Sequence, residues 1–230
     1  MILPENEIHV HVIDLDYYMS ELDYFQTNLT DEEKNNANRF YSQIDKERYI
    51  LRYGIYRAIL SKYLNLRPVE IALKTSESGK PFVEKNQISI SFTSSQHFCS
   101  IAIGKNLQLG VDIEQLKDDS EYRQMAKMFF STDENIFLEQ LAENNLTLAF
   151  LKIWTAKEAF IKANKVIDPA KFTISFANFP DRYNTLTFDN NTWHFYSLKN
   201  QFGLIITVVA DKPNLIIKNI DNNLLSFPKK

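Results

Sequence analysis

Three consecutive segments between residues 88 and 116 alternate apolar and polar side chains in the manner of β-strands. They read ISISFT, FCSIAIG and LQLGVDIEQL, and only a few residues separate each from the next. Alternate side chains on a strand point to the same face of a sheet, so this period predicts strands with a buried face. We therefore expect a cluster of antiparallel strands in this part of the chain.

Helical patterns lie on both sides of this cluster. Residues 45–64 form a long helical pattern, and further helices are expected at about 120–130, 132–143 and 146–164. Strand patterns then return in KFTISF, TLTFD, WHFYSL and FGLIITVVA. Because each half combines helices with a cluster of strands, the sequence predicts an α+β fold. We place the join near residues 104–110, between an N-terminal half at 1–106 and a C-terminal half at 107–230.

The composition argues against some classes of protein. A formal net charge of −3 does not suit a nucleic-acid-binding protein that relies on bulk positive potential. The one cysteine, Cys99, allows no intrachain disulfide, and its place in a strand pattern favours an inert buried thiol. We see no signal peptide and no apolar run long enough to cross a bilayer. A cytoplasmic protein without nucleic-acid or membrane partners is expected.

Two carboxylates interrupt the apolar stretch LQLGVDIEQL. Asp112 and Glu114 are two residues apart on a predicted strand, so they share one face while Val111 and Ile113 share the other. Like charges so close repel each other unless something positive or a polar solvent separates them. A metal ion, a basic ligand or open water would each satisfy this requirement.

The stretch FLKIWTAKEAFIKANK at 150–165, in the predicted helix at about 146–164, carries a third carboxylate. Trp154, Glu158 and Lys162 are four residues apart and share one helix face. A Glu and a Lys at this spacing are most often a plain surface pair. If the helix packs on the acidic face of the strand, however, Asp112, Glu114 and Glu158 form a set of hard oxygen ligands suited to Mg²⁺, which commonly also binds substrate phosphates.

These two stretches resemble the paired signature of the 4′-phosphopantetheinyl transferases. GVDIE at 110–114 is similar to the family's G-[IV]-D-[IV]-E, and WTAKEAFIK at 154–162 is similar to its W-x-x-K-E-[AS]. The chain length resembles that of the single-chain, surfactin-type (Sfp-like) group. Further agreement spans about residues 39–165 and includes MAKMFFSTDE, SGKP and DKERYILRYGIYRAIL.

The resemblance implies a group-transfer enzyme. The family moves the 4′-phosphopantetheine arm of coenzyme A to a serine hydroxyl of an apo acyl or peptidyl carrier protein and releases 3′,5′-ADP. It implies that Asp112, Glu114 and Glu158 hold Mg²⁺ on the pyrophosphate of coenzyme A, the co-substrate. Glu158 is then the candidate base for the incoming serine, and Lys162, together with Lys157, would offset pyrophosphate charge.

Other matched positions concern coenzyme A. Arg48 and Lys80 correspond to family positions near its 3′-phosphate and adenine. The family usually has an S-H-S turn whose His helps bind a phosphate, whereas Thr93, Ser94 and Ser95 stand at that place in this chain. Ser94 can donate a hydrogen bond but carries no charge. Another basic residue, with His97 as the candidate, would have to compensate, or coenzyme A would bind more weakly.

The family fold implies a pseudodimer of two similar halves, each with helices packed on a small, mostly antiparallel sheet. Coenzyme A and Mg²⁺ would bind in the cleft between the halves, and the chain would act as a monomer. The carrier's recognition helix is usually acidic, so a local basic or apolar surface should receive it. One alternative is a catalytically inactive, family-derived module that binds carrier proteins or nucleotides; a weaker one is another Mg²⁺-dependent enzyme acting on a nucleotide.

Overall fold

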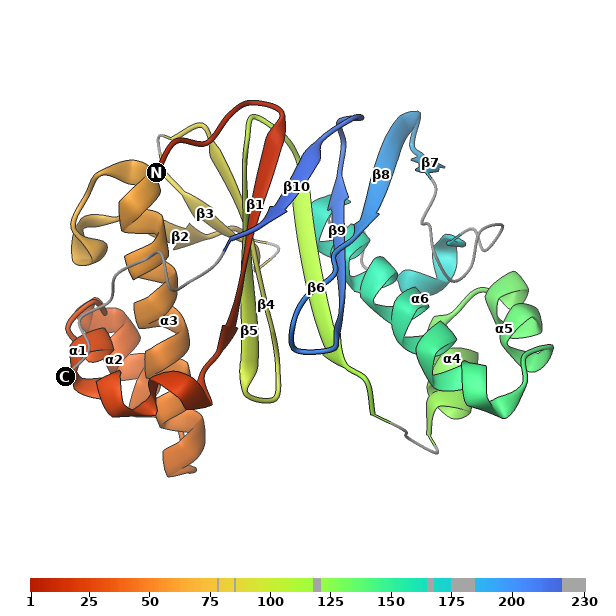
Figure 1. The fold of residues 1–230 in the computed structure, drawn as a ribbon, viewed down its shortest axis with the longest axis horizontal. Coiled ribbons are helices and arrows are strands. Elements are labelled where there is room, and N and C mark those ends of the chain that lie inside the picture. Colours follow the sequence, from red (N-terminus) through yellow and green to blue (C-terminus); the bar gives the residue numbers. More distant parts are fainter. Residues whose placement is uncertain (78, 85, 118–120, 165–167, 175–184, 221–230) are drawn as a thin grey trace.

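Two four-stranded sheets and two long helices form the body of the protein. This computed structural model describes residues 1–230 apart from 78, 85, 118–120, 165–167, 175–184 and 221–230. Helix α3 (Gln43–Leu64) and helix α6 (Glu143–Asn164) each contain 22 residues. Figure 1 shows α3 outside one sheet and α6 outside the other, with the two sheets between them. The α+β class predicted from the sequence is confirmed.

The first sheet has the strand order β10-β1-β5-β4. Its strands are β1 (Glu7–Asp14), β4 (Ile88–Ser95), β5 (Phe98–Lys105) and β10 (Ile216–Asn219). β5 pairs antiparallel with both β1 and β4, whereas β10 pairs parallel with β1. The last described strand therefore lies in the N-terminal sheet, although its residues belong to the predicted C-terminal half.

The second sheet has the order β6-β9-β8-β7, with every neighbouring pair antiparallel. Its strands are β6 (Leu109–Gln115), β7 (Thr185–Phe188), β8 (Asn191–Ser197) and β9 (Leu204–Ala210). The arrangement β1-β5-β4 recurs as β6-β9-β8: the first strand pairs with the last, and the strand before the last lies outside it. Along the chain, the long helix α3 lies between β1 and β4, and the long helix α6 lies between β6 and β8.

Shorter elements connect the main ones. They are α1 (Leu22–Gln26), α2 (Asp31–Ala37), α4 (Tyr122–Phe129), α5 (Thr132–Glu139), the hairpin β2 (Leu73–Thr75) and β3 (Pro81–Val83), and three 3₁₀ helices at Asp16–Glu21, Pro68–Glu70 and Pro169–Lys171. The strand expected at KFTISF is wrong where the structure describes it. Lys171 ends a 3₁₀ helix and residues 172–174 form no strand, while the rest of that segment lies outside the described residues.

The strand period divides the core into layers. Ile8, Val10 and Val12 of β1 pack with Val111 and Ile113 of β6, so one apolar cluster fills the space between the two sheets. The alternate residues of β1 and β5 face α3 and pack in a separate cluster. Burial on both faces explains why β5 is mainly apolar. In β1, His9 and His11 interrupt the apolar pattern, and each forms a hydrogen bond with the hydroxyl of Tyr63 on α3. No helix among the described residues is long and apolar enough to span a bilayer.

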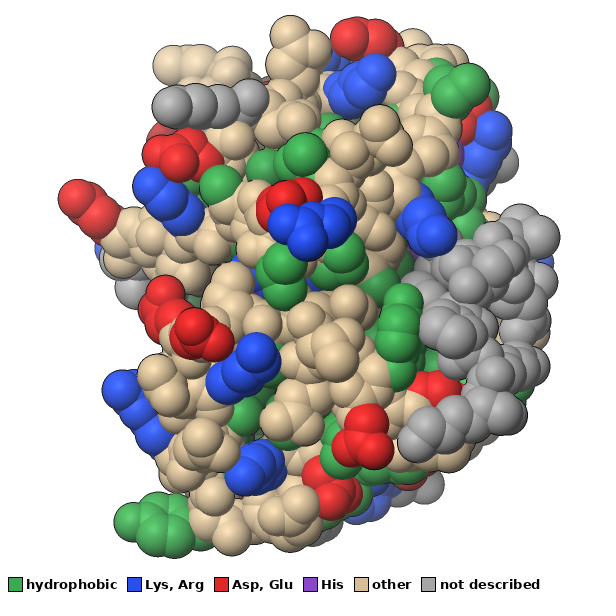
Figure 2. All heavy atoms as spheres, turned by 90° about the vertical axis from the view of Figure 1, so that its left-hand side faces the viewer, with side chains coloured by type: hydrophobic (Ala, Val, Ile, Leu, Met, Phe, Trp, Pro, Cys, Tyr) green, Lys and Arg blue, Asp and Glu red, His purple; other side chains and the backbone are tan. Residues whose placement is uncertain are grey.

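The charged side chains are mixed on the face covered by the N-terminal helices. Figure 2 views the molecule from this side, and its described part shows basic and acidic side chains interspersed rather than gathered into one patch. Arg67 and Glu70 form one exposed ion pair of this half, and Lys74 and Glu84 form another. Exposed pairs of this kind contribute little to stability.

Gly110 allows α6 to pack directly on β6. A Cβ atom at this position would overlap the carbonyl oxygen of Ala159, and it would lie only 2.9 Å from the Ala159 carbonyl carbon and from the Ala163 nitrogen. These are backbone atoms of α6, so they cannot rotate away as a side chain can. Glycine at 110 therefore determines how closely the helix approaches the strand, and with it the position of the neighbouring Asp112.

We predict that Gly110→Ala lowers the free energy of unfolding by about 3 kcal/mol, the upper end for inserting a methyl group into a packed site. Gly104→Ala is the matched control, because its Cβ would meet only the flexible end of Leu107, at 3.1 Å. That variant should change stability by less than about 1 kcal/mol. Urea denaturation measures both, and equal effects of the two substitutions would contradict the close packing at Gly110.

Candidate active site

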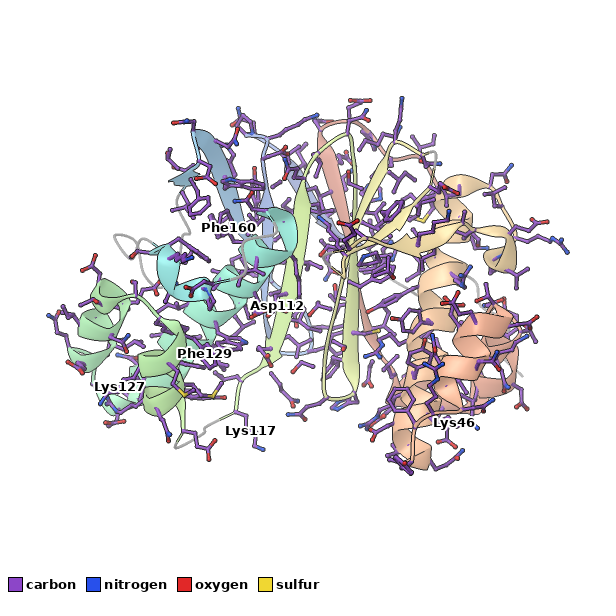
Figure 3. All side chains as sticks on the ribbon, turned by 180° about the vertical axis from the view of Figure 1, so that it is seen from behind. Lys46, Asp112, Lys117, Lys127, Phe129 and Phe160 are labelled. Atoms are coloured by element: carbon purple, nitrogen blue, oxygen red, sulfur yellow. The ribbon has the colours of Figure 1, made fainter. Side chains whose placement is uncertain are left out.

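Strand β6 and helix α6 bring four charged side chains together. Asp112 and Glu114 point toward α6, on the same face of β6 as Gly110. Glu158 and Lys162 are one turn apart on α6. Figure 3 shows Asp112 where α6 crosses β6. The packing of helix on strand that the sequence alone could not establish is therefore present, and it gathers the predicted carboxylates and lysine.

Asp112 is the most enclosed member of the group, with 5% of its surface exposed. Its Oδ1 accepts hydrogen bonds from Lys162 Nζ at 2.6 Å and from Thr93 Oγ1 at 2.8 Å. Lys162 Nζ also donates to Thr93 Oγ1 at 3.1 Å. Among the described residues Asp112 Oδ2 has no partner although it is buried. A buried carboxylate oxygen without a donor is costly, and it marks a position where a cation would be favourable.

The hydroxyl groups of β4 form a row of hydrogen bonds to β6 and to the residue Leu107 just before it. Every second residue of ISISFTSS is Ser or Thr, and these side chains face the neighbouring sheet. Ser95 Oγ donates to Glu114 Oε2 at 2.6 Å, and Thr93 binds Asp112 as described above. The remaining contacts are Ser89 Oγ to the Leu107 carbonyl at 2.6 Å and the Val111 N–H to Ser91 Oγ at 3.1 Å. Residues of both halves thus hold the carboxylates, and the alternating Ser/Thr pattern was the available sequence signal for it.

The environment disfavours negative charge on all three carboxylates. Burial raises the pKa of Asp112, of Glu114 and of Glu158 above the ordinary value of each group. The charge of Asp112 raises the pKa of both Glu114 and Glu158 further, and the Lys162 ammonium opposes the rise at all three. One lysine does not balance three carboxylates, so an additional cation would stabilise their charged forms.

Mg²⁺ fits this set of donors. Three carboxylates, one with an unpartnered buried oxygen, provide the hard oxygen atoms that Mg²⁺ prefers.

A second group of potential metal ligands lies at the carboxyl end of β1. It consists of Asp14, Asp16 and His97, each of which offers one ligand atom, and these atoms lie within 4.8 Å of one another. The Asp16 carboxylate of this group also pairs with Arg48.

Lys157, which the sequence predicted to lie near the pyrophosphate, lies apart from this group of charged side chains. Its ammonium is buried, pairs with Glu134 at 2.7 Å and donates to the carbonyls of Pro169 and Phe172 at 2.6 and 2.7 Å. These three contacts use all three N–H donors of a lysine, so none remains for a phosphate of coenzyme A. Desolvation lowers the pKa of Lys157, and the charge of Glu134 opposes this shift. Lys157 instead joins α6 to α5 and the following 3₁₀ helix.

Of the predicted coenzyme A residues of the N-terminal half, Thr93 contacts Asp112, whereas Arg48, Lys80 and Ser94 bind other partners. Arg48 Nη2 binds both carboxylate oxygens of Asp16, at 3.0 and 3.3 Å. Lys80 Nζ donates to the Leu109 carbonyl, at the start of β6. Ser94 Oγ accepts a hydrogen bond from Arg52 at 2.8 Å, a contact that no sequence pattern predicted.

Three other residues noted in the sequence, His97, Trp154 and Cys99, lie outside the group around Asp112. His97 packs against Phe98 and lies with Asp14 and Asp16 rather than with Ser94. Trp154 packs with Phe150 in the aromatic cluster beneath α4. Cys99 is fully buried, which confirms the prediction of a core thiol, and burial raises its pKa to about 12, which disfavours the reactive thiolate.

Comparison with known proteins agrees with this geometry. The family profile described as 4'-phosphopantetheinyl transferase superfamily matches residues 108–209, a segment that contains Asp112, Glu114, Glu158 and Lys162. The 4'-phosphopantetheinyl transferase HetI of Nostoc sp. is 31% identical over 165 residues, which cover 70% of each chain. The chain therefore belongs to the 4′-phosphopantetheinyl transferase superfamily.

Two further relatives support membership in the Sfp-like group. The transferase gsp of Aneurinibacillus migulanus is 30% identical over 159 residues, or 69% of this chain and 61% of that protein. The transferase Sfp of Bacillus subtilis is 29% identical over 145 residues, or 62% of each chain. These two matches span less than two thirds of the relatives' own length.

The Lys157–Glu134 pair gives a test of stability. Lys157→Met should lower the free energy of unfolding by about 3–5 kcal/mol, because it leaves the Glu134 carboxylate buried without its cation. Adding Glu134→Gln should recover part of this loss, since the uncompensated charge is then removed. Chemical denaturation of the single and double variants measures the coupling. A stable Lys157→Met protein with weakened coenzyme A binding would instead restore Lys157 to the ligand site.

Glu158 gives a test of pH dependence. Its pKa is raised on folding, so the folded protein retains a proton that the unfolded chain has already released. The free energy of unfolding of the wild type must therefore fall as the pH rises from the ordinary carboxyl range through the raised pKa. Glu158→Gln removes this loss, so the variant should gain stability relative to the wild type between pH 4 and pH 8 in buffer with a chelator. A constant difference across that range would contradict the raised pKa.

Proposed function

We propose that this chain transfers the 4′-phosphopantetheine arm of coenzyme A to a serine hydroxyl of an apo acyl or peptidyl carrier protein and releases 3′,5′-ADP. The observation that carries the proposal is the meeting of Asp112, Glu114, Glu158 and Lys162 inside the segment that matches the superfamily. The three relatives described above are all named 4'-phosphopantetheinyl transferases. The retention of the whole carboxylate set supports an active enzyme over a binding module without catalysis.

Asp112, Glu114 and Glu158 would hold Mg²⁺ against the pyrophosphate of coenzyme A. Bound there, Mg²⁺ would neutralise pyrophosphate charge and make the phosphorus more electrophilic. Thr93 and Ser95 support this arrangement because they hold one oxygen of Asp112 and of Glu114 through hydrogen bonds. Lys162 already contacts Asp112 and lies at the same place, so its ammonium would bind a pyrophosphate oxygen.

The transfer requires one proton to leave the serine hydroxyl. As the serine oxygen forms its bond to the β-phosphorus, the bond from that phosphorus to the bridging oxygen breaks, and its electron pair leaves with 3′,5′-ADP. Glu158 would accept the serine proton. The position of its carboxylate beside Asp112, Glu114 and Lys162, where the pyrophosphate would lie, supports this assignment.

We also propose that the two halves form a pseudodimer with coenzyme A between them, acting as a monomer in the cytoplasm. The recurrence of β1-β5-β4 as β6-β9-β8, each with one long helix, supports two similar halves. The contribution of β4 to a site on β6 and α6 supports a ligand at their junction. Lys80 and Arg48 remain proposed coenzyme A contacts of the N-terminal half.

The carrier protein would dock beside β6 and α4. Leu116 directly follows β6 and is 54% exposed, and Met128 on α4 is 65% exposed. Lys117 and Lys127 are exposed neighbours in the sequence of these two apolar residues, and Figure 3 shows both toward the α4 end of the molecule. Apolar side chains next to lysines complement an acidic recognition helix with an apolar face.

Incubation with coenzyme A, Mg²⁺ and a panel of apo carrier proteins tests the proposal by intact mass. We expect a 4′-phosphopantetheine adduct on at least one carrier and none when a chelator replaces Mg²⁺. Glu158→Gln should reduce transfer by at least about 100-fold, since general-base catalysis typically contributes this much or more. Glu139→Gln, at an exposed glutamate of α5, is the control and should keep wild-type activity. The absence of an adduct on every carrier would reject the proposed function.

A further inference from the structure

Arg52 presents an unneutralised guanidinium at the end of β4. It lies on α3, and its Nη1 donates to Ser94 Oγ at 2.8 Å. Its guanidinium carbon lies over the rings of Tyr49 and Tyr53, 5.8 and 5.6 Å from their centroids. No described carboxylate pairs with it. Contacts of this kind orient a guanidinium while leaving most of its N–H donors available.

The other basic residues of this region already have acidic partners. Arg48, one turn earlier on α3, binds Asp16 at 3.0 Å, and Arg57, further along the helix, binds Glu33 at 2.7 Å in the core. On the other side of β4, Lys162 binds Asp112 at 2.6 Å. Arg52 is therefore the arginine of α3 whose positive charge is available to an anionic ligand among the described residues.

Arg52 and Lys162 flank the same short piece of β4. Thr93 and Ser95 face the carboxylates of β6, whereas the side chain of Ser94 points to the opposite face of the strand, toward α3. Consecutive Cα atoms are about 3.8 Å apart, so the two cationic positions are separated by little more than the thickness of one strand. A ligand with two separate phosphate groups would match this arrangement.

Coenzyme A has two such groups, the pyrophosphate and the phosphomonoester on the ribose 3′-oxygen. We propose that Arg52, positioned by Ser94, binds the 3′-phosphate of coenzyme A. This inference rests on the proposed function, which assigns the pyrophosphate to Lys162 and the carboxylates. A phosphomonoester offers three oxygens to the planar fork of a guanidinium, and such charge-assisted, bidentate contacts are strong. Because Asp16 neutralises Arg48, Arg52 is the better partner for this dianion.

Kinetics with coenzyme A and 3′-dephospho-coenzyme A test the assignment. The wild type should have a lower KM for coenzyme A than for 3′-dephospho-coenzyme A. In Arg52→Ala the KM for coenzyme A should rise by roughly 10- to 100-fold, as expected when a hydrogen bond to a charged group is lost, with kcat little changed. The KM for 3′-dephospho-coenzyme A should not change. Arg67→Ala, which removes an exposed arginine paired with Glu70, is the control and should leave both values unchanged.

A binding measurement separates this inference from the proposed function. Calorimetry should show that 3′,5′-ADP binds the wild type more tightly than 5′-AMP does, and that Arg52→Ala abolishes the difference. If no carrier is modified but this dependence on Arg52 remains, the function is wrong and the phosphate assignment stands. If transfer occurs and Arg52→Ala discriminates coenzyme A from its dephospho form as the wild type does, the inference is overturned.

Ser94 provides a second variant that does not remove the guanidinium. Ser94→Ala should raise the KM for coenzyme A by a smaller factor than Arg52→Ala, and it should add nothing in the Arg52→Ala background, because the serine acts through the arginine. Arg52→Gln, which keeps most of the side-chain volume, replaces Arg52→Ala if that variant does not fold. An additive effect of Ser94→Ala and Arg52→Ala would contradict the positioning role of Ser94.

Discussion

The candidate site depends on the close contact between α6 and β6. Gly110 has no side chain, so the backbone of α6 rests against the strand, and the next inward-facing residues of β6 come within reach of Glu158 and Lys162. A larger residue at 110 would move the helix outward along the whole contact. The distance between Asp112 Oδ1 and Lys162 Nζ, 2.6 Å, is a consequence of that packing. The electrostatics of the carboxylates follow from the same contact, since it excludes water from them.

The sequence was sufficient for those parts of the site that depend on local periodicity. The two-residue period of a strand predicted that Asp112 and Glu114 share a face, and the four-residue spacing on a helix predicted the same for Glu158 and Lys162. Neither period predicts how the helix lies relative to the strand, because this depends on tertiary packing. Lys157 illustrates the limit. It is adjacent to Glu158 in the sequence, but a helix turns by about 100° per residue, and this rotation directs Lys157 to Glu134 instead.

Contacts between the two halves were the hardest to predict. The Ser and Thr residues of β4 read as ordinary polar positions of an alternating strand until β6 lies next to them. Arg52 was one of several arginines on a helix, and only its neighbours distinguish it: Arg48 and Arg57 have carboxylate partners, whereas Arg52 contacts Ser94. In each case the partner is between 18 and 42 residues away in the chain. A single-sequence pattern can therefore show which face of a strand or helix is polar, but not which residue that face contacts.

The parallel pairing of β10 with β1 also affects the order in which the protein can form. The chain passes from the first sheet to the second between β5 and β6, and it returns to the first sheet after β9. During synthesis, β1, β4 and β5 are made well before β10. The edge of β1 that pairs with β10 therefore stays unpaired until residues 216–219 have been synthesised. An exposed strand edge invites pairing with other chains. The nascent protein is therefore most exposed to misassociation in the interval between the synthesis of β5 and the arrival of β10.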